Sequence, residues 1–276
     1  MLLKVLTLNV LSPEHADWDR RRAVLRSRLR EIRADVVALQ ETVRVPDFDA
    51  AADLLGPDYT LVHHSQRSAD GVGAVLASRW PVETVREIDL RVTPRIRLPW
   101  AAAVVAEVRL PLPFGLTIFV HHKPTYEVGF ARERELQAVA AARFVEEQIA
   151  ERDLHVVLMG DFDDTPDSSS IRFWSGRQSL EGFSVAYRDA WDAVHPAEAG
   201  DTFSPGNPLV AAGEMPLELG RRIDYVLVRC GRHGPSLEVL DCRRVLDHDV
   251  DGVWASDHFG VLAELGVPAH RPGAWA

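Results

Sequence analysis

Apolar residues recur along the chain at two spacings, one typical of buried strands and one typical of amphipathic helices. Short apolar runs bounded by Gly, Pro or polar residues predict strands, and apolar residues three and four positions apart predict helices. The expected strands are 2–9, 35–41, 59–64, 71–77, 82–89, 100–110, 116–122, 156–159, 222–229, 237–245 and 258–265. The expected helices are 17–33, 47–55, 130–151 and 168–174.

Strands outnumber helices, and short links join many neighbouring strands. This pattern predicts mixed or antiparallel sheets covered by helices, in an α/β (α+β) fold. Runs 71–77 and 82–89 flank a turn at Ser78–Pro81 and predict a hairpin, whereas residues 176–220 are rich in Gly, Pro and polar residues and predict irregular structure. No repeat or linker interrupts residues 1–276, so we expect one domain with a tail at about 267–276.

The formal net charge is −10, with 46% hydrophobic and 26% charged residues. Such a charge argues against a broad basic surface for nucleic acid, since that binding depends on phosphate neutralisation. It leaves open a small phosphate ester held by a metal. The N-terminus has no signal-peptide pattern and no apolar run could span a bilayer. The sparse cysteines, Cys230 and Cys242, favour a reducing compartment. We therefore expect a cytoplasmic monomer.

The helix expected at 17–33 carries seven arginines: Arg20, Arg21, Arg22, Arg26, Arg28, Arg30 and Arg33. The favoured interpretation is a solvated helix face. A phosphate-binding face is the less favoured alternative, because no aromatic residue is interleaved with the arginines.

Polar residues stand at the ends of several apolar strands. The stretch Met159–Asp164 places three carboxylates within four residues, and clustered carboxylates repel one another unless a cation or a proton is present. In a mixed sheet the start of one strand lies beside the end of another, so such groups can meet on one rim. The candidates are Asn9, Glu41, His122, Asp161, Asp163, Asp224, Asp257 and His258.

These residue types suit metal-assisted hydrolysis. Mg²⁺ prefers oxygen ligands and needs only one or two carboxylates, and a bound metal can polarise a phosphoryl oxygen. A His with an Asp partner suits proton transfer to or from water. No Gly-x-Ser-x-Gly nucleophile motif competes. His121 and His122 are adjacent on a strand and must face opposite sides, so only one can point into the site.

From Thr7–Asn9 to Ser256–His258 the chain resembles the endonuclease/exonuclease/phosphatase superfamily, which has the deoxyribonuclease-I-like fold. Six short motifs occur in the family's order. They are Leu6–Asn9, Leu39–Glu41, Gly73–Pro81, Gly160–Asp163 after the His122 strand, Arg222–Tyr225 and Ser256–Phe259. The resemblance implies a four-layer sandwich, with two mixed β-sheets packed face to face and helices outside.

The resemblance also implies residue roles. Glu41 would be the principal ligand of Mg²⁺ or Mn²⁺, with Asn9 contacting metal or phosphate and Asp257 as a second metal ligand. Asp161 would orient or deprotonate the attacking water. His258, held by Asp224, would bind or activate phosphate or water. His122, in preference to His121, would hydrogen-bond the phosphate.

Two positions depart from the family's pattern. Asp163 stands where relatives usually have Asn, so it either binds a cation or is protonated by its neighbours. Lys123 follows His122 where many relatives have an apolar residue. Lys123 either reaches a substrate phosphate or is a solvated surface lysine.

The expected function is a metal-dependent phosphoesterase, with a phosphodiester favoured over a monoester. The alternatives are a nuclease acting on DNA or RNA and a catalytically silent binding module. Segments 123–130 and 168–220 are expected to border the cleft. Within them Arg172, Phe173, Trp174 and Phe203 form either a base-stacking platform or, as the favoured interpretation, part of the core.

Overall fold

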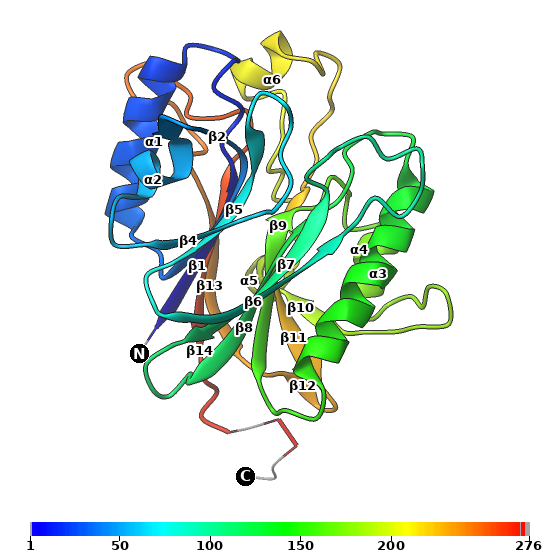
Figure 1. The fold of residues 1–276 in the computed structure, drawn as a ribbon. Helices are drawn as coiled ribbons and strands as arrows, with labels where there is room; N and C mark the ends of the chain where they lie inside the picture. The colour runs from blue at the N-terminus through cyan, green and yellow to red at the C-terminus, as the bar shows by residue number, and fades with distance from the viewer. Residues whose placement is uncertain (1, 271, 274–276) are drawn as a thin grey trace.

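The computed structural model describes residues 2–270 and 272–273. Within this part of the chain, two mixed seven-stranded sheets pack face to face, and helices cover their outer faces (Figure 1). The expected sandwich is confirmed. The predicted tail at 267–276 lies partly outside the described residues.

The first sheet has the strand order β13-β14-β1-β2-β5-β4, with β3 added beside β2. Its strands are β13 (Glu238–Val245), β14 (Gly260–Gly266), β1 (Leu3–Asn9), β2 (Val36–Val45), β5 (Val72–Ser78), β4 (Thr60–His63) and β3 (Phe48–Asp49). Helices α1 (Trp18–Ile32) and α2 (Ala50–Leu55) cover its outer face. The cap residues are the ones expected at helix starts, because Asp17 and Asp49 accept from backbone amides of the first turns.

The second sheet has the order β10-β11-β9-β8-β7-β6, with β12 beside β11. Its strands are β10 (Tyr187–Asp189), β11 (Asp224–Gly231), β9 (His155–Asp161), β8 (Leu116–Lys123), β7 (Ala102–Arg109), β6 (Val82–Asp89) and β12 (Gly234–Pro235). Helices α3 (Ala131–Ile149) and α4 (Ser169–Trp174) lie on its outer face. Short helices α5 (Ala190–Val194) and α6 (Pro208–Ala212) interrupt the region expected to be irregular.

Three apolar clusters separate these layers. One lies between the two sheets and includes Val5, Val157 and Val261. A second joins α1 and α2 to the first sheet, and a third joins α3 and α4 to the second. Strands buried on both faces explain the nearly continuous apolar runs that the sequence shows, such as Val156–Met159.

The predicted hairpin around Ser78–Pro81 is wrong. β5 pairs with β2 and β4, whereas β6 pairs with β7, so this turn carries the chain from one sheet to the other. The indole of Trp80 donates to the Asp35 carboxylate at 3.0 Å and fixes the crossing. A short Pro-containing turn has the same local sequence in both arrangements, so its pattern does not decide which strands pair.

Two parallel strand pairs place the functional rim. β1 runs parallel to β2 through α1, and β8 runs parallel to β9 through α3. The carboxyl ends of each parallel pair therefore lie at one edge of the sandwich. In the part of the chain that the structure describes, no helix is both long and apolar enough to cross a membrane.

Candidate active site

The strand-end residues meet at one rim of the sandwich. Asn9 lies at the carboxyl end of β1, Glu41 lies within β2, and Asp161 ends β9. β11 is antiparallel to β9, and its first residue, Asp224, lies opposite Asp161. His258 lies just before β14, which is antiparallel to β1. The starts and ends of strands from both sheets therefore converge as expected.

Glu41 reaches the rim through a distortion of β2. The register between β2 and β5 shifts between Leu39 and Thr42, and Glu41 has a left-handed φ of 62°. A non-glycine residue in this conformation costs about 1–3 kcal/mol and persists only where its surroundings enforce it. Its carboxylate accepts from the Ser12 amide at 3.1 Å. The bulge therefore directs the Glu41 side chain toward the rim and fixes its position there.

Asn9 links two carboxylates. Its Nδ2 donates to Glu41 at 2.9 Å and to Asp161 at 3.1 Å, while its Oδ1 accepts from the Leu11 amide at 3.0 Å. The amide oxygen expected to contact metal or phosphate is thus already hydrogen-bonded. In this arrangement Asn9 positions Glu41 and Asp161.

Arg21 does not belong to the solvated arginine face. It is 2% exposed and donates to carbonyl oxygens of both chain segments beside the rim, those of Val10, Leu11, Ser12, His15, Ala16 and Ala255. Burial lowers the pKa of Arg21, and the charges of Asp257 and Glu41 partly offset this. Arg21 therefore ties the segment after Asn9 to the segment before Asp257. The solvated-face prediction fails at this position because helical spacing does not show which arginine points inward.

Lys123 lies between two carboxylates. Its ammonium is almost fully buried and donates to Asp161 at 2.9 Å and to Asp163 in a shorter contact. Burial opposes the charge of Lys123, but Asp161 and Asp163 outweigh it and raise its pKa. Of the two interpretations given to Lys123, the solvated surface lysine is wrong, because β8 turns this side chain toward the cavity.

The two carboxylates beside Lys123 differ in charge. Burial raises the pKa of Asp161, but Lys123 and then His258 reverse this, so its pKa lies below the ordinary value. Burial, followed by repulsion from Asp161, raises the pKa of Asp163 to about 7 against a partial offset from Lys123. The pair thus contains one firmly ionised carboxylate and one that titrates near neutral pH.

His258 and Asp224 form a buried pair. Nδ1 of His258 lies 3.0 Å from Oδ2 of Asp224. Burial opposes protonation of His258, but Asp224, and then Asp161 and Asp257, raise its pKa to about 10. Burial also raises the pKa of Asp224. The imidazole is therefore a charged hydrogen-bond donor at neutral pH.

Glu41 and Asp257 fit a hard divalent cation. Both line the same cavity, and neither has an ion-pair partner among the described residues. Burial raises the pKa of Asp257, with Glu41 adding to the shift and His258 opposing it. Two adjacent carboxylates without a cationic partner form the hard oxygen donor set that Mg²⁺ or Mn²⁺ binds.

A second group of ligand-type atoms lies close together. One atom each from Asp161, Asp224 and His258 lie within 4.8 Å of one another. A protonated imidazole offers no lone pair to a metal, and His258 holds its proton through Asp224. This group suits proton handling better than metal binding.

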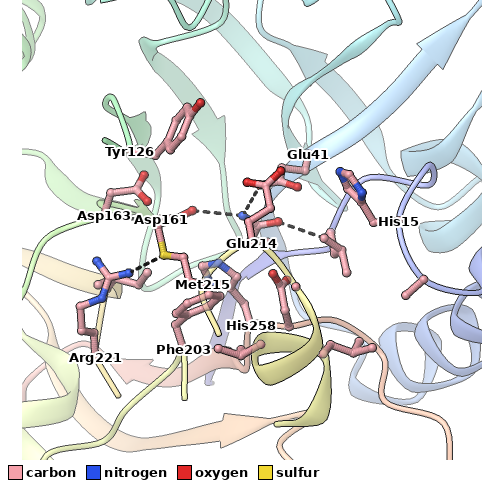
Figure 2. A pocket seen from close by; sticks show the side chains of 18 of the residues that line it. His15, Glu41, Tyr126, Asp161, Asp163, Phe203, Glu214, Met215, Arg221 and His258 are labelled. Carbon is pink, nitrogen blue, oxygen red and sulfur yellow. Dashed lines mark hydrogen bonds between the residues drawn. The ribbon is translucent and has the colours of Figure 1, made fainter. Parts of the chain in front are cut away.

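The rim opens into one cavity of about 470 Å³ (Figure 2). Asn9, Glu41, Asp161, Asp163, Asp257 and His258 line it together with Lys123. The segments expected to border the cleft do so, because Tyr126 and Phe203 also line it. Further lining residues that the sequence did not single out are Leu11, His15, Ala16, Leu98, Trp100, Leu209, Val210, Ala212, Gly213, Glu214, Met215, Arg221 and Ile223. Most are apolar or lie on loops, so only their place in the fold identifies them.

Neither histidine of β8 lines this cavity. The ring of His122 packs edge-on against Phe162 and Trp174, with centroids 4.8 Å and 5.6 Å away, on the helix-covered face. His121 faces the other sheet, where its Nε2 lies 2.7 Å from Gln40 Nε2. The structure thus does not bring His122 to the other candidates, because strand alternation gives the cavity-facing place to Lys123.

The residues considered as a base-stacking platform do not lie together. Phe173 and Trp174 are fully buried beneath α3, and Arg172 lies on the exposed side of α4. Phe203 alone lines the cavity, with its ring centroid 4.9 Å from that of His258. Asp164, the third carboxylate of the Met159–Asp164 stretch, accepts from Ser170 at 2.6 Å at the start of α4.

The fold and the rim define a phosphoesterase-type scaffold. The chain belongs to the endonuclease/exonuclease/phosphatase family, whose model matches residues 6–258. Members of this family are hydrolases that act on phosphoester bonds, and they generally use divalent metals such as Mg²⁺. None of the curated proteins matches the sequence.

Solved structures share the fold. TDP2 from D. rerio, complexed with single strand DNA product, is 18% identical with a TM-score of 0.73, covering 96% of this chain and 99% of its own. TDP2 from C. elegans is 14% identical with a TM-score of 0.75, covering 97% and 76%. A mannosyl-6-phosphatase from Bacteroides thetaiotaomicron is 17% identical with a TM-score of 0.69, covering 95% and 99%. At these identities the likeness concerns the fold alone.

Proposed function

We propose that this protein is a divalent-metal-dependent phosphoesterase that hydrolyses a phosphodiester by in-line attack of water. One observation carries the proposal. Glu41 and Asp257, which have no ion-pair partner among the described residues, share a single cavity with the ionised Asp161 and with His258, which Asp224 holds from behind. A metal site, a water-orienting carboxylate and a charged hydrogen-bond donor thus stand around one reaction volume.

Glu41 and Asp257 are the proposed holders of the metal, with Asn9 fixing the position of Glu41. When bound, Mg²⁺ or Mn²⁺ would polarise a phosphoryl oxygen and offset charge on the leaving oxygen. The chain itself supplies orientation, because Ser12 and Asn9 hold the Glu41 carboxylate from two sides.

Asp161 is the proposed acceptor for the attacking water. Its Oδ1 accepts from the Asp163 amide at 3.2 Å and its Oδ2 from Asn9 and Lys123. These bonds hold the carboxylate in one orientation and keep it ionised. An oriented, ionised acceptor can align a water molecule and draw its proton as attack proceeds.

His258 is the proposed donor to the phosphoryl oxygens. Asp224 accepts at its Nδ1 and leaves the other ring nitrogen as a donor. Such a fixed cationic donor stabilises charge that develops on oxygen in the transition state. Lys123 adds a second positive charge between Asp161 and Asp163. The role expected for His122 passes in this proposal to Lys123.

Two alternatives are less favoured. A nuclease would need cations for a polynucleotide backbone, whereas the net charge is −10. A silent binding module would have no reason to keep the full set of rim groups in one cavity. The monomeric state and the cytoplasmic location stay predictions.

The test is hydrolysis of bis(4-nitrophenyl) phosphate and 4-nitrophenyl phosphate with Mg²⁺, with Mn²⁺ and with EDTA. We expect metal-dependent diester hydrolysis that exceeds monoester hydrolysis. His258→Gln should lower kcat by roughly 10²- to 10⁴-fold. The matched control is His248→Gln, which changes an exposed histidine paired with Asp247. Hydrolysis that survives EDTA would contradict the proposal.

A further inference from the structure

The cavity has a charged floor and apolar walls. The floor consists of the strand-end groups described above. One wall, around α6, contains Phe203, Leu209, Val210 and Met215, and a second, just before β7, contains Leu98 and Trp100. Figure 2 shows Phe203, Met215 and Arg221 grouped together on one side of the cavity. A ligand bound at the floor must therefore extend along apolar surface.

Both walls belong to apolar clusters that hold their side chains in place. Phe203, Val210, Ile223 and Met215 form a small apolar cluster of their own, apart from the three layer cores. Trp100 and Leu98 form another with Val72, Ala74 and Val43. Clusters of this kind hold side chains in fixed positions beneath loops. The walls are thus part of the fold rather than adaptable loop surface.

The α6 wall is tied directly to the reacting groups. The fully buried Asn207 side chain donates to the carbonyl oxygens of Ser256 and Asp257 at 2.8 Å and 3.2 Å. Phe203 forms bridges with Arg221 and His258, and the Arg221 guanidinium lies over its ring. This geometry fixes the distance between the apolar wall and the phosphate position.

The cations that line the cavity are already paired. Among the described lining residues, Lys123 pairs with Asp161 and Asp163, and His258 pairs with Asp224. Arg221 pairs with Glu218, and the histidine ring of His15 lies 3.3 Å from Glu14. Glu214 adds a carboxylate to the lining. A second or third phosphate would meet no free cation here and would approach acidic side chains.

From these walls and charges we infer that the cavity takes a substrate with a single phosphodiester group and one uncharged apolar or aromatic substituent, and that it rejects a polyanionic chain. The inference rests on the proposed function for the position of the phosphate. The substituent packs against the apolar side chains of Met215, Phe203 and Trp100. A volume of about 470 Å³ suits a small molecule.

Binding measurements separate this inference from catalysis. The probes are methyl phenylphosphonate and methyl methylphosphonate, which are monoanions that differ only in the group on phosphorus, and a tetrathymidylate. Calorimetry with Mg²⁺ should show the phenyl compound binding about 10- to 100-fold more tightly than the methyl compound, the range that burial of one such group provides. The tetrathymidylate should bind more weakly than the phenyl compound.

Variants locate the preference. Leu209→Ser with Met215→Ser should reduce the phenyl-to-methyl affinity ratio to within about threefold of one. The control Leu112→Ser removes a leucine that is 85% exposed in the turn before β8, away from the Lys123 end of that strand, and should keep the ratio. Glu214→Gln should strengthen tetrathymidylate binding.

Equal affinity for the two phosphonates, or tightest binding of the tetrathymidylate, would overturn the inference. Metal-dependent diester hydrolysis without a phenyl preference would leave the proposed function standing and remove only the substrate class. A phenyl preference without metal-dependent hydrolysis would support the substrate class and contradict the proposed function.

Discussion

Lys123 offers the most direct test of how the site is held together. It is the buried cation between Asp161 and Asp163. Lys123→Met keeps a similar length and volume but leaves two carboxylates facing each other with no positive charge between them. Removing one partner of a buried ion pair costs about 3–5 kcal/mol, because the remaining charge is left without compensation. The free energy of unfolding should fall by that amount.

The assay is urea unfolding at pH 8, above the pKa of about 7 that Asp163 has beside Lys123. Loss of Lys123 raises the pKa of Asp163 further, so the cost of Lys123→Met consists of carboxylate repulsion together with proton uptake by Asp163. A second variant, Lys123→Met with Asp163→Asn, removes the surplus negative charge as well. If the cost of Lys123→Met comes from carboxylate repulsion, the double variant should recover about 1–3 kcal/mol relative to the sum of the two single changes.

Arg109→Met is the matched control. It removes an arginine from an exposed ion pair with Glu83 and should change the stability little. Strictly additive effects of Lys123→Met and Asp163→Asn would refute the reasoning, as would a Lys123→Met variant as stable as the control.

Three further predictions concern titration, loop support and close packing. The pKa of Asp163 is raised from 3.8 to about 7, with burial as the largest cause. Protonation of Asp163 therefore stabilises the folded state. This contribution is fully present below pH 3.8 and is lost as the pH rises through 7. Asp163→Asn should therefore flatten the decline of stability over that window, and an unchanged pH profile in urea unfolding would contradict the assignment. Arg21→Met should lower the free energy of unfolding by about 3 kcal/mol or more, since it leaves buried carbonyl groups without donors. The same variant should bind Mg²⁺ more weakly in calorimetry. The control Arg20→Met, on the exposed side of α1, should change neither quantity. Gly160→Ala should prevent normal folding, as judged by circular dichroism, because the added Cβ would lie 2.0 Å from the carbonyl oxygen of His122; a native-like Gly160→Ala variant would show that β8 and β9 can separate.

The layer arrangement and the rim could be predicted because both follow from local patterns. Buried strands leave continuous apolar runs, and Asn9, Glu41 and Asp161 each stand where such a run ends. The order of the short motifs added the pairing of Asp224 with His258, which the 3.0 Å contact bears out.

Other features depend on contacts that the sequence pattern does not contain. Helical spacing identifies the face of α1 but not that Arg21 reaches six carbonyl groups. Strand alternation requires His122 and Lys123 to face opposite sides, yet only the position of β8 against Phe162 decides which one enters the cavity. The walls of the cavity come from α6 and from loops far apart in the sequence, so no single stretch of sequence predicts them.

The proposed function depends most directly on Glu41, the carboxylate at the β2 bulge that we propose as a metal ligand. Initial rates of diester hydrolysis should be measured across a Mg²⁺ titration for the unchanged protein and for Glu41→Gln, which keeps the size of the side chain and removes its charge. We predict saturable Mg²⁺-dependent turnover in the first and a loss of at least about 10²-fold in the second, the scale on which metal ligation and charge stabilisation act. Equal rates for the two proteins at every Mg²⁺ concentration would contradict the account.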